Sequence, residues 1–93
     1  MQNNFITIII YYYNRKKTIL RTLSSIIKNF KDKEVNIILI DDNSNDNTSY
    51  LARNFLNIKN YKFKFIKNNR NRGTNYCKNF GLNISKTKWT IFL

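Results

Sequence analysis

The stretch from Val35 to Asp46 reads V-N-I-I-L-I-D-D-N-S-N-D, and its two halves differ sharply in character. The first half, Val35 to Ile40, is nearly continuous in branched apolar residues, which is typical of a strand buried on both faces of a parallel sheet. The second half consists of short polar residues that favour turns and helix caps. The stretch therefore predicts a buried strand that ends abruptly at a polar loop.

Three further strand patterns flank this stretch. A second β-branched run, Phe5 to Tyr11, precedes it, and two more segments follow it, Lys62 to Lys67 and Trp89 to Leu93. In Lys62 to Lys67 lysines alternate with apolar residues, so one face of this strand is solvated and its lysines protect a free edge. We therefore expect this third strand at an edge of the sheet.

Apolar residues at helical spacing predict three helices between the strands. The first spans residues 15 to 30, with Asn14 as its candidate N-cap. The second begins at a cap formed by Asp46 or Thr48, and the third follows a loop over residues 68 to 73. The apolar positions expected to face the sheet are Ile19, Leu20, Leu23, Ile26, Ile27, Phe30, Leu51, Phe55, Ile58, Tyr76, Cys77, Phe80 and Ile84.

The alternation of strands and helices predicts an α/β fold. We expect a half-Rossmann unit, with a four-stranded parallel sheet of order 3-2-1-4 and helices on both faces. The chain has 93 residues and no repeat or linker, so residues 1–93 form one domain. Gly81 inside the third helix predicts that this helix packs closely on the sheet, because glycine otherwise weakens a helix.

Composition excludes several kinds of site. The chain has no histidine, one cysteine and two glycines, which excludes a histidine or four-cysteine zinc site, an internal disulfide and a G-x-G-x-x-G loop. The formal net charge is +12, but the basic residues are scattered, which is typical of compositional bias. We expect no specific nucleic-acid recognition, whereas attraction to a membrane surface remains open. The single cysteine predicts a cytoplasmic protein, compatible with peripheral attachment at the inner face of the membrane.

Aromatic and polar residues follow each of the first three predicted strands. They are Tyr11 to Asn14, Asp41 to Ser44, and Asn71 to Gly73. The carboxyl ends of parallel strands lie at one edge of the sheet, where ligands of such folds bind. Aromatic faces, carboxylates and a cation beside a helix N-terminus suit the base, ribose and phosphates of a nucleoside diphosphate. The sequence therefore predicts a nucleotide site at this edge.

Four segments, in order, resemble the N-terminal nucleotide-binding half of a family 2 glycosyltransferase with the GT-A fold. They are I-I-I-Y-Y-Y-N-R at 8–15, I-L-I-D-D-N-S-N-D-N-T at 38–48, N-R-G-T-N-Y-C-K-N-F-G at 71–81 and W-T-I-F-L at 89–93. The resemblance implies an enzyme that binds a nucleoside-diphosphate sugar, usually with a divalent metal such as Mn or Mg. Such an enzyme transfers the sugar to an acceptor, here an unidentified glycan or lipid-linked sugar.

The resemblance implies binding roles for six residues: Tyr13, Asp41, Asp42, Arg72, Gly73 and Asn79. Tyr13 matches the aromatic residue near the base. Asp42 matches the carboxylate that holds the base, and Asp41 is its partner in the same turn. The other three match the segment that lines the nucleotide and sugar pocket. No residue is assigned a catalytic or metal-ligating role.

The chain departs from the family pattern at several points. Tyr11 stands where the family usually has proline, and Lys78 where arginine is common, which loses bidentate geometry. The family's D-x-D motif, which holds the metal, should follow the fourth strand, but the sequence ends at Leu93 and contains no D-x-D. The acid that would act as general base is also absent. We therefore expect a truncated chain that is inactive alone.

Two other functions remain open. One is a non-catalytic remnant or an interaction module whose sheet is completed by a partner, because the apolar strand 89–93 would form a free edge that pairs with another chain or with itself. The other, less favoured, is a small basic nucleic-acid-binding domain, which would bind with a steep salt dependence.

Overall fold

The computed structural model describes residues 6–30, 35–87 and 89–93. Its elements, in chain order, are β1 (Ile6–Tyr12), α1 (Ile19–Asn29), β2 (Val35–Asp41), α2 (Thr48–Ile58), β3 (Phe63–Lys67), α3 (Thr74–Ile84) and β4 (Trp89–Phe92). All strand pairs are parallel and the sheet order is β3-β2-β1-β4. The predicted fold class and strand order are confirmed. Phe5, the first residue of the predicted first strand, lies outside the described residues.

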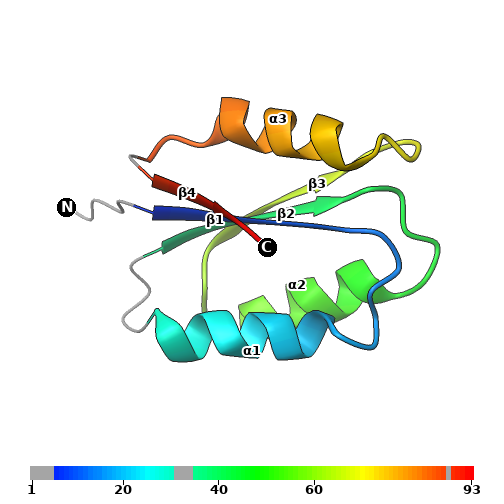
Figure 1. Ribbon diagram of the computed structural model, residues 1–93. Helices are drawn as coiled ribbons and strands as arrows, with labels where there is room; N and C mark the ends of the chain where they lie inside the picture. Colours follow the sequence, from blue (N-terminus) through cyan, green and yellow to red (C-terminus); the bar gives the residue numbers. More distant parts are fainter. Residues whose placement is uncertain (1–5, 31–34, 88) are drawn as a thin grey trace.

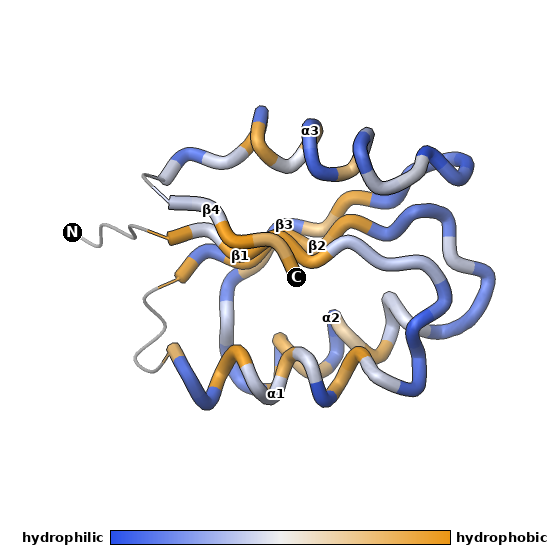
Figure 2. The backbone as a smooth tube through the Cα atoms, viewed as in Figure 1, coloured by the Kyte–Doolittle hydropathy of each residue, from blue (hydrophilic) through white to orange (hydrophobic). Residues whose placement is uncertain are grey.

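The sheet separates two layers of helix. α1 and α2 cover one face and α3 covers the other (Figure 1). Successive side chains of β1 point to opposite faces of the sheet. Ile8 and Ile10 pack in the cluster with α1 and α2, whereas Ile9 packs with Cys77 of α3. The apolar residues of the tube in Figure 2 accordingly gather along the sheet between the layers. Both faces of the central strands are buried, which explains their continuous apolar sequences.

Gly81 lies where α3 crosses β1. A Cβ atom at this position would lie 2.5 Å from Cδ1 of Ile9, closer than real Cβ contacts permit. The predicted close packing of the third helix is confirmed, because only a residue without a Cβ fits here.

The first helix begins later than predicted. α1 starts at Ile19, and the segment before it forms a turn in which the N–H of Thr18 donates to the carbonyl of Arg15 at 3.0 Å. Asn14 is not its N-cap, since this residue has a left-handed φ of 52° and belongs to the preceding loop. The expectation of a helix from residue 15 was therefore wrong, because contacts to the next loop compete with helical geometry there.

Three of the predicted buried positions are exposed. Ile58 at the end of α2 is 72% exposed, Tyr76 in α3 is 40% exposed and Leu20 in α1 is 38% exposed. The buried residues of α2 are instead Thr48, Ala52 and Leu56. The predictions for these positions were wrong because the sheet is narrow and each helix buries a stripe of only a few residues.

The sheet has two different edges. β3 lies at one edge, as its alternating lysines predicted, and β4 lies at the other. None of the described helices has the length and apolar character needed to cross a membrane.

Candidate functional site

The carboxyl ends of β1, β2 and β3 meet at one end of the sheet, on the right of Figure 1. The loops after β1 and β2 are bonded to each other. The N–H of Asn14 donates to Oγ of Ser44 at 2.8 Å, and the Oδ1 of Asn14 accepts from the N–H of Asn45 at 2.9 Å. The N–H of Arg15 donates to Oγ1 of Thr48 at 2.8 Å. These bonds fix the loop that carries the tyrosines against the loop that carries the acids.

A cavity of about 390 Å³ opens at this end of the sheet. Its volume falls in the range of small-molecule sites. Its lining residues are Tyr11, Tyr12, Tyr13, Arg15, Asp42, Asn71, Gly73, Thr74 and Leu93. A smaller cavity of about 210 Å³ lies at the far end, between β3 and the end of α3, and none of the predicted site residues lines it. The predicted site therefore coincides with the cavity of about 390 Å³. A further cavity of about 430 Å³ lies between α1 and β4, and none of the predicted site residues lines it.

Asp42 contributes the buried carboxylate of this cavity. Its Oδ1 accepts from Nδ2 of Asn68 at 2.8 Å and from the N–H of Arg72 at 2.7 Å, and its Oδ2 accepts from the N–H of Gly73 at 2.9 Å. Burial alone raises the pKa of Asp42, but these three hydrogen bonds and a further one with the Cys77 thiol outweigh it, so the pKa lies below its usual value. Asp42 is therefore ionised at neutral pH and ties the loop after β3 to the end of β2.

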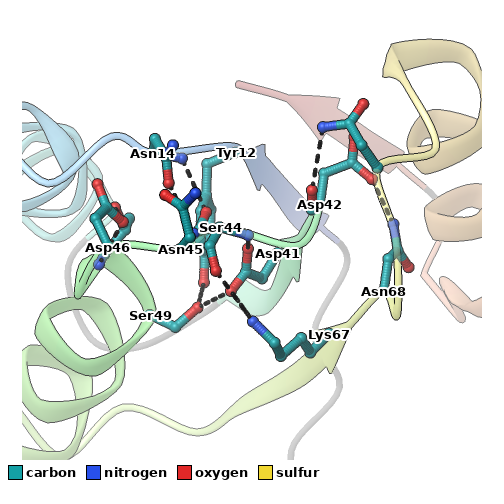
Figure 3. Close-up of polar contacts among 12 residues, drawn as sticks. Tyr12, Asn14, Asp41, Asp42, Ser44, Asn45, Asp46, Ser49, Lys67 and Asn68 are labelled. Carbon is teal, nitrogen blue, oxygen red and sulfur yellow. Dashed lines mark hydrogen bonds and ion pairs between the residues drawn. The ribbon is translucent and has the colours of Figure 1, made fainter.

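Asp41 faces the other side of the sheet, and Figure 3 shows its carboxylate beside Ser49 and Lys67. Its Oδ1 accepts from the N–H of Ser44 at 2.7 Å, and its Oδ2 accepts from the hydroxyl of Ser49 at 2.5 Å and from Nζ of Lys67 at 3.4 Å. Asp41 is 1% exposed and does not line the cavity. These contacts join β2, α2 and β3, so the structure gives Asp41 a scaffolding role.

Tyr12 completes this polar cluster. Its hydroxyl lies 2.7 Å from Oγ of Ser49. Because Ser49 donates its hydrogen to Asp41, the tyrosine hydroxyl must donate to Ser49. Burial raises the pKa of Tyr12 well above its usual value, so this hydroxyl remains protonated.

The other predicted residues differ in their placement. Tyr13 lines the cavity and is 40% exposed, and Gly73 lines it at the N-cap of α3 with a φ of 89°. Arg72 reaches the site through its backbone N–H, while its guanidinium lies 4.9 Å from the ring centre of Tyr76. Asn79 is exposed on α3, outside the cavity lining. The structure thus brings together Tyr13, Asp42 and Gly73.

The sequence assigned no binding role to Arg15 or Asn68, and it included Asn71 only within the segment that follows the third strand. Arg15 lines the cavity, and its Nη1 donates to the carbonyl of Tyr13 at 3.0 Å. Asn71 also lines it, and its Nδ2 donates to the carbonyl of Asp42 at 3.3 Å. All three residues follow the carboxyl end of β1 or β3, and this position could have identified them as site residues. Asparagine and basic residues are so common in this chain that their presence in a loop was not distinctive.

The described residues do not fit a divalent metal. They contain no group of three or more acidic, cysteine or histidine side chains that could hold one. The two adjacent carboxylates already accept hydrogen bonds: Asp41 from Ser44, Ser49 and Lys67, and Asp42 from Asn68 and two backbone N–H groups.

A protein-family model described as glycosyl transferase family 2 matches residues 7–93. Among curated proteins, poly-beta-1,6-N-acetyl-D-glucosamine synthase of Staphylococcus epidermidis is 34% identical over 95% of this chain, which covers 21% of that protein. The Escherichia coli UDP-Glc:alpha-D-GlcNAc-diphosphoundecaprenol beta-1,3-glucosyltransferase WfaP is 35% identical, and the match covers 95% of this chain and 34% of WfaP. The chain thus spans about a third or less of the length of these relatives.

Solved structures share the fold. S. aureus TarS 1-349 in complex with UDP-GlcNAc superposes with a TM-score of 0.85 at 24% identity, covering 96% of this chain and 26% of the TarS 1-349 chain. The mannosyltransferase PcManGT from Pyrobaculum calidifontis, in complex with GDP-Man and Mn2+, gives a TM-score of 0.78 at 19% identity, covering 87% of this chain and 24% of that one. At these identities the likeness shows the fold alone.

Proposed function

The chain belongs to glycosyl transferase family 2, and on that premise we propose that the cavity at the carboxyl ends of β1, β2 and β3 binds the nucleoside diphosphate of a sugar donor. The observation that carries the proposal is the buried, ionised carboxylate of Asp42 in the cavity lining. Asp42 is 5% exposed and lines the cavity beside the exposed ring of Tyr13. A buried charge that is fully held by the protein and still faces a cavity suits recognition of a polar ligand.

The base is recognised by Asp42 and Tyr13. Asp42 accepts from three N–H donors of the protein, and the Cys77 thiol also interacts with it. Because Asp42 still lines the cavity, its carboxylate accepts an N–H group of the base there as well. Tyr13 supplies an aromatic face on which the base stacks, an interaction worth about 1–3 kcal/mol for nucleobases.

The diphosphate lies toward Arg15 and the start of α3. Gly73 and Thr74 line the cavity at the N-terminus of this helix, where backbone N–H groups and the helix dipole favour an anion. Arg15 lines the same cavity and adds a guanidinium, which suits phosphate oxygens. This assignment gives Arg15 the cationic role that the sequence had suggested for Arg72.

One comparison supports a uridine diphosphate sugar as the donor: the name of WfaP, which is 35% identical to this chain, specifies UDP-Glc. In the proposed reaction an acceptor hydroxyl attacks the anomeric carbon, the bond from that carbon to the diphosphate breaks, and UDP leaves. The acceptor's proton needs a base, and the described acids Asp41, Asp42 and Asp46 already accept hydrogen bonds. We therefore propose that these 93 residues bind the donor without transferring its sugar.

The test is calorimetric titration of the chain with UDP-GlcNAc, together with an assay for sugar transfer. Asp42→Asn should weaken binding about tenfold or more, because it removes the charge that accepts the base N–H. Tyr13→Ala should weaken it severalfold without affecting folding, since this ring is exposed. Asp46→Asn makes the same chemical change outside the cavity and should bind as the unmodified chain does.

Three results would contradict the proposal. They are no binding of UDP-GlcNAc by the unmodified chain, unchanged affinity in both Asp42→Asn and Tyr13→Ala, and clear sugar transfer by the chain alone.

A further inference from the structure

Asn68 contacts the Asp42 carboxylate of the proposed donor site but does not itself line the cavity. It follows β3, is 9% exposed, and its backbone N–H donates to the carbonyl of Asp41 at 2.8 Å. Its side-chain Nδ2 donates to Oδ1 of Asp42 at 2.8 Å and to Sγ of Cys77 at 3.5 Å. Figure 3 shows the Asn68 amide directed at Asp42. The side chain is therefore held between the end of β2 and the inner face of α3.

The chemistry of the pair fixes the orientation of the Asn68 amide. Nδ2 is a donor with two hydrogens, and it has an acceptor in each of its two contacts. Turning the amide over would place its carbonyl oxygen against the Asp42 carboxylate, where both groups are acceptors. The carboxylate thus selects one rotamer of the amide, and the amide in turn restrains the carboxylate.

This restraint acts on the oxygen that the ligand does not need. Oδ1 of Asp42 accepts from Asn68 and from the N–H of Arg72, whereas Oδ2 accepts from one N–H group, that of Gly73. The Cys77 thiol also interacts with this carboxylate. Oδ2 therefore has fewer protein N–H donors than Oδ1 and is the oxygen available to an N–H group of a ligand. Without the Asn68 donor, the carboxylate could rotate about its terminal bond and the position of Oδ2 would no longer be fixed.

We propose that Asn68 is a positioning residue of the donor site, which holds the Asp42 carboxylate so that Oδ2 accepts the N–H of the base. This inference rests on the proposed function, because it assigns Asn68 a role in that same site. Asn68 does not line the cavity, so it acts on the ligand only through Asp42.

The surroundings of the pair contain few groups that titrate near neutral pH. Burial, and then the charge of Asp42, raise the pKa of Cys77 on α3, so that side chain remains a neutral thiol. Lys67 of β3 pairs with the neighbouring carboxylate, the guanidinium of Arg72 lies over Tyr76, and Arg15 is on the far side in the cavity lining with the β1 tyrosines. A carboxyl group introduced at position 68 would be the group that titrates.

The test is Asn68→Asp, which keeps the size and shape of the side chain and replaces the donor by an acceptor. UDP-GlcNAc binding is measured by calorimetry from pH 8 to pH 5.5, a range in which the sugar-linked diphosphate stays fully charged. The unmodified chain should bind with nearly constant affinity, because the pKa of Asp42 lies below its usual value. Asn68→Asp should bind about tenfold more weakly at pH 8, where two carboxylates oppose each other.

As the pH falls, the introduced carboxyl gains a proton and becomes a donor again, so the affinity of Asn68→Asp should rise toward that of the unmodified chain. A merely structural defect would not reverse in this way. The matched control is Asn69→Asp, which adds the same charge at the next, exposed residue of the same loop. Its affinity should stay within about threefold of the unmodified chain, as expected for an exposed charge.

If Asn68→Asp fails to fold by circular dichroism, Asn68→Ser and Asn68→Ala provide a second comparison. They have similar volumes and differ in one hydroxyl donor, so the serine variant should bind several times more tightly. Equal affinity of these two variants, or a pH profile of Asn68→Asp that parallels the unmodified chain, overturns this inference and leaves the proposed function standing. No binding by the unmodified chain overturns both.

Discussion

Gly81 and Ile9 set the distance between α3 and the sheet. Three atoms of the Ile9 side chain lie within 3.3 Å of the position that a Cβ on residue 81 would occupy. Ile9 is fully buried and its β-branched side chain has little rotational freedom, so it cannot move aside without disturbing the second core cluster. The absence of a Cβ atom at Gly81 therefore allows α3, which starts at the proposed site, to pack closely on β1.

We predict that Gly81→Ala lowers the free energy of unfolding by about 1–2 kcal/mol. Overpacking typically costs about 1–3 kcal/mol, and the gain in helix propensity from alanine offsets about 1 kcal/mol of it at most. Chemical denaturation measures the change. The double variant with Ile9→Val, which lacks Cδ1, should recover part of the loss. A Gly81→Ala chain more stable than the unmodified one would contradict this close contact.

Asp41 and Asp42 show what a residue-level interpretation of the sequence can miss. The sequence placed both acids at the predicted site, and the structure places only Asp42 in the cavity lining. Side chains alternate across a strand, so Asp41 shares the face of Ile37 and Leu39 toward α1 and α2. The sequence ended this strand at residue 40, whereas β2 ends at Asp41. Because the predicted strand was one residue too short, Asp41 was assigned to the loop, and the alternation that places Asp41 and Asp42 on opposite faces of the sheet was missed.

At the scale of elements, Ser49 joins three of them. Its hydroxyl on α2 accepts from Tyr12 of β1 and donates to Asp41 of β2. This bridge lies beneath the cavity and holds the helix against the ends of two strands.

We predict that Ser49→Ala lowers the free energy of unfolding by about 1–3 kcal/mol, because it leaves a buried hydroxyl and a buried carboxylate each short of a partner. UDP-GlcNAc affinity at native conditions should remain unchanged, since Asp41 scaffolds the loop and does not contact the ligand. Denaturant unfolding and calorimetry together measure both quantities. Ser25→Ala, at an exposed position of α1, is the matched control and should have little effect on either.

Sequence periodicity predicted the existence, type and order of all these elements, because the central strands are buried on both faces and their apolar runs are unambiguous. Element ends were less predictable. The start of α1 depends on the hydrogen bond from Arg15 to Thr48, which joins residues far apart in sequence. Ile58 is 72% exposed because it is the last residue of α2 and belongs to neither core cluster of the described residues. Local patterns carry no information on either.

At the scale of the whole molecule, the two edges of the sheet differ in charge. The β3 edge carries Lys64 and Lys67, both exposed, whereas β4 from Trp89 to Phe92 has no charged residue in a chain of net charge +12. Trp89 is 59% exposed, and Ile91 is 36% exposed. An uncharged apolar edge strand pairs readily with another chain, and lysines are a common protection against this.

We therefore predict that the chain self-associates through β4 at micromolar concentration. The net charge opposes association, so added salt should strengthen it by screening the repulsion between copies. Ile91→Lys places a charge on this edge and should shift the chain to monomer. Ile58→Lys is the matched control, because it makes the same substitution at a more exposed residue, 72%, on α2. Sedimentation velocity at low and high salt measures the distribution of monomers and oligomers.

Two outcomes would show that β4 is not the surface through which copies of the chain associate. One is a monomer at all salt concentrations, which would mean that an exposed apolar strand does not drive pairing in so basic a molecule. The other is an equal effect of the two substitutions.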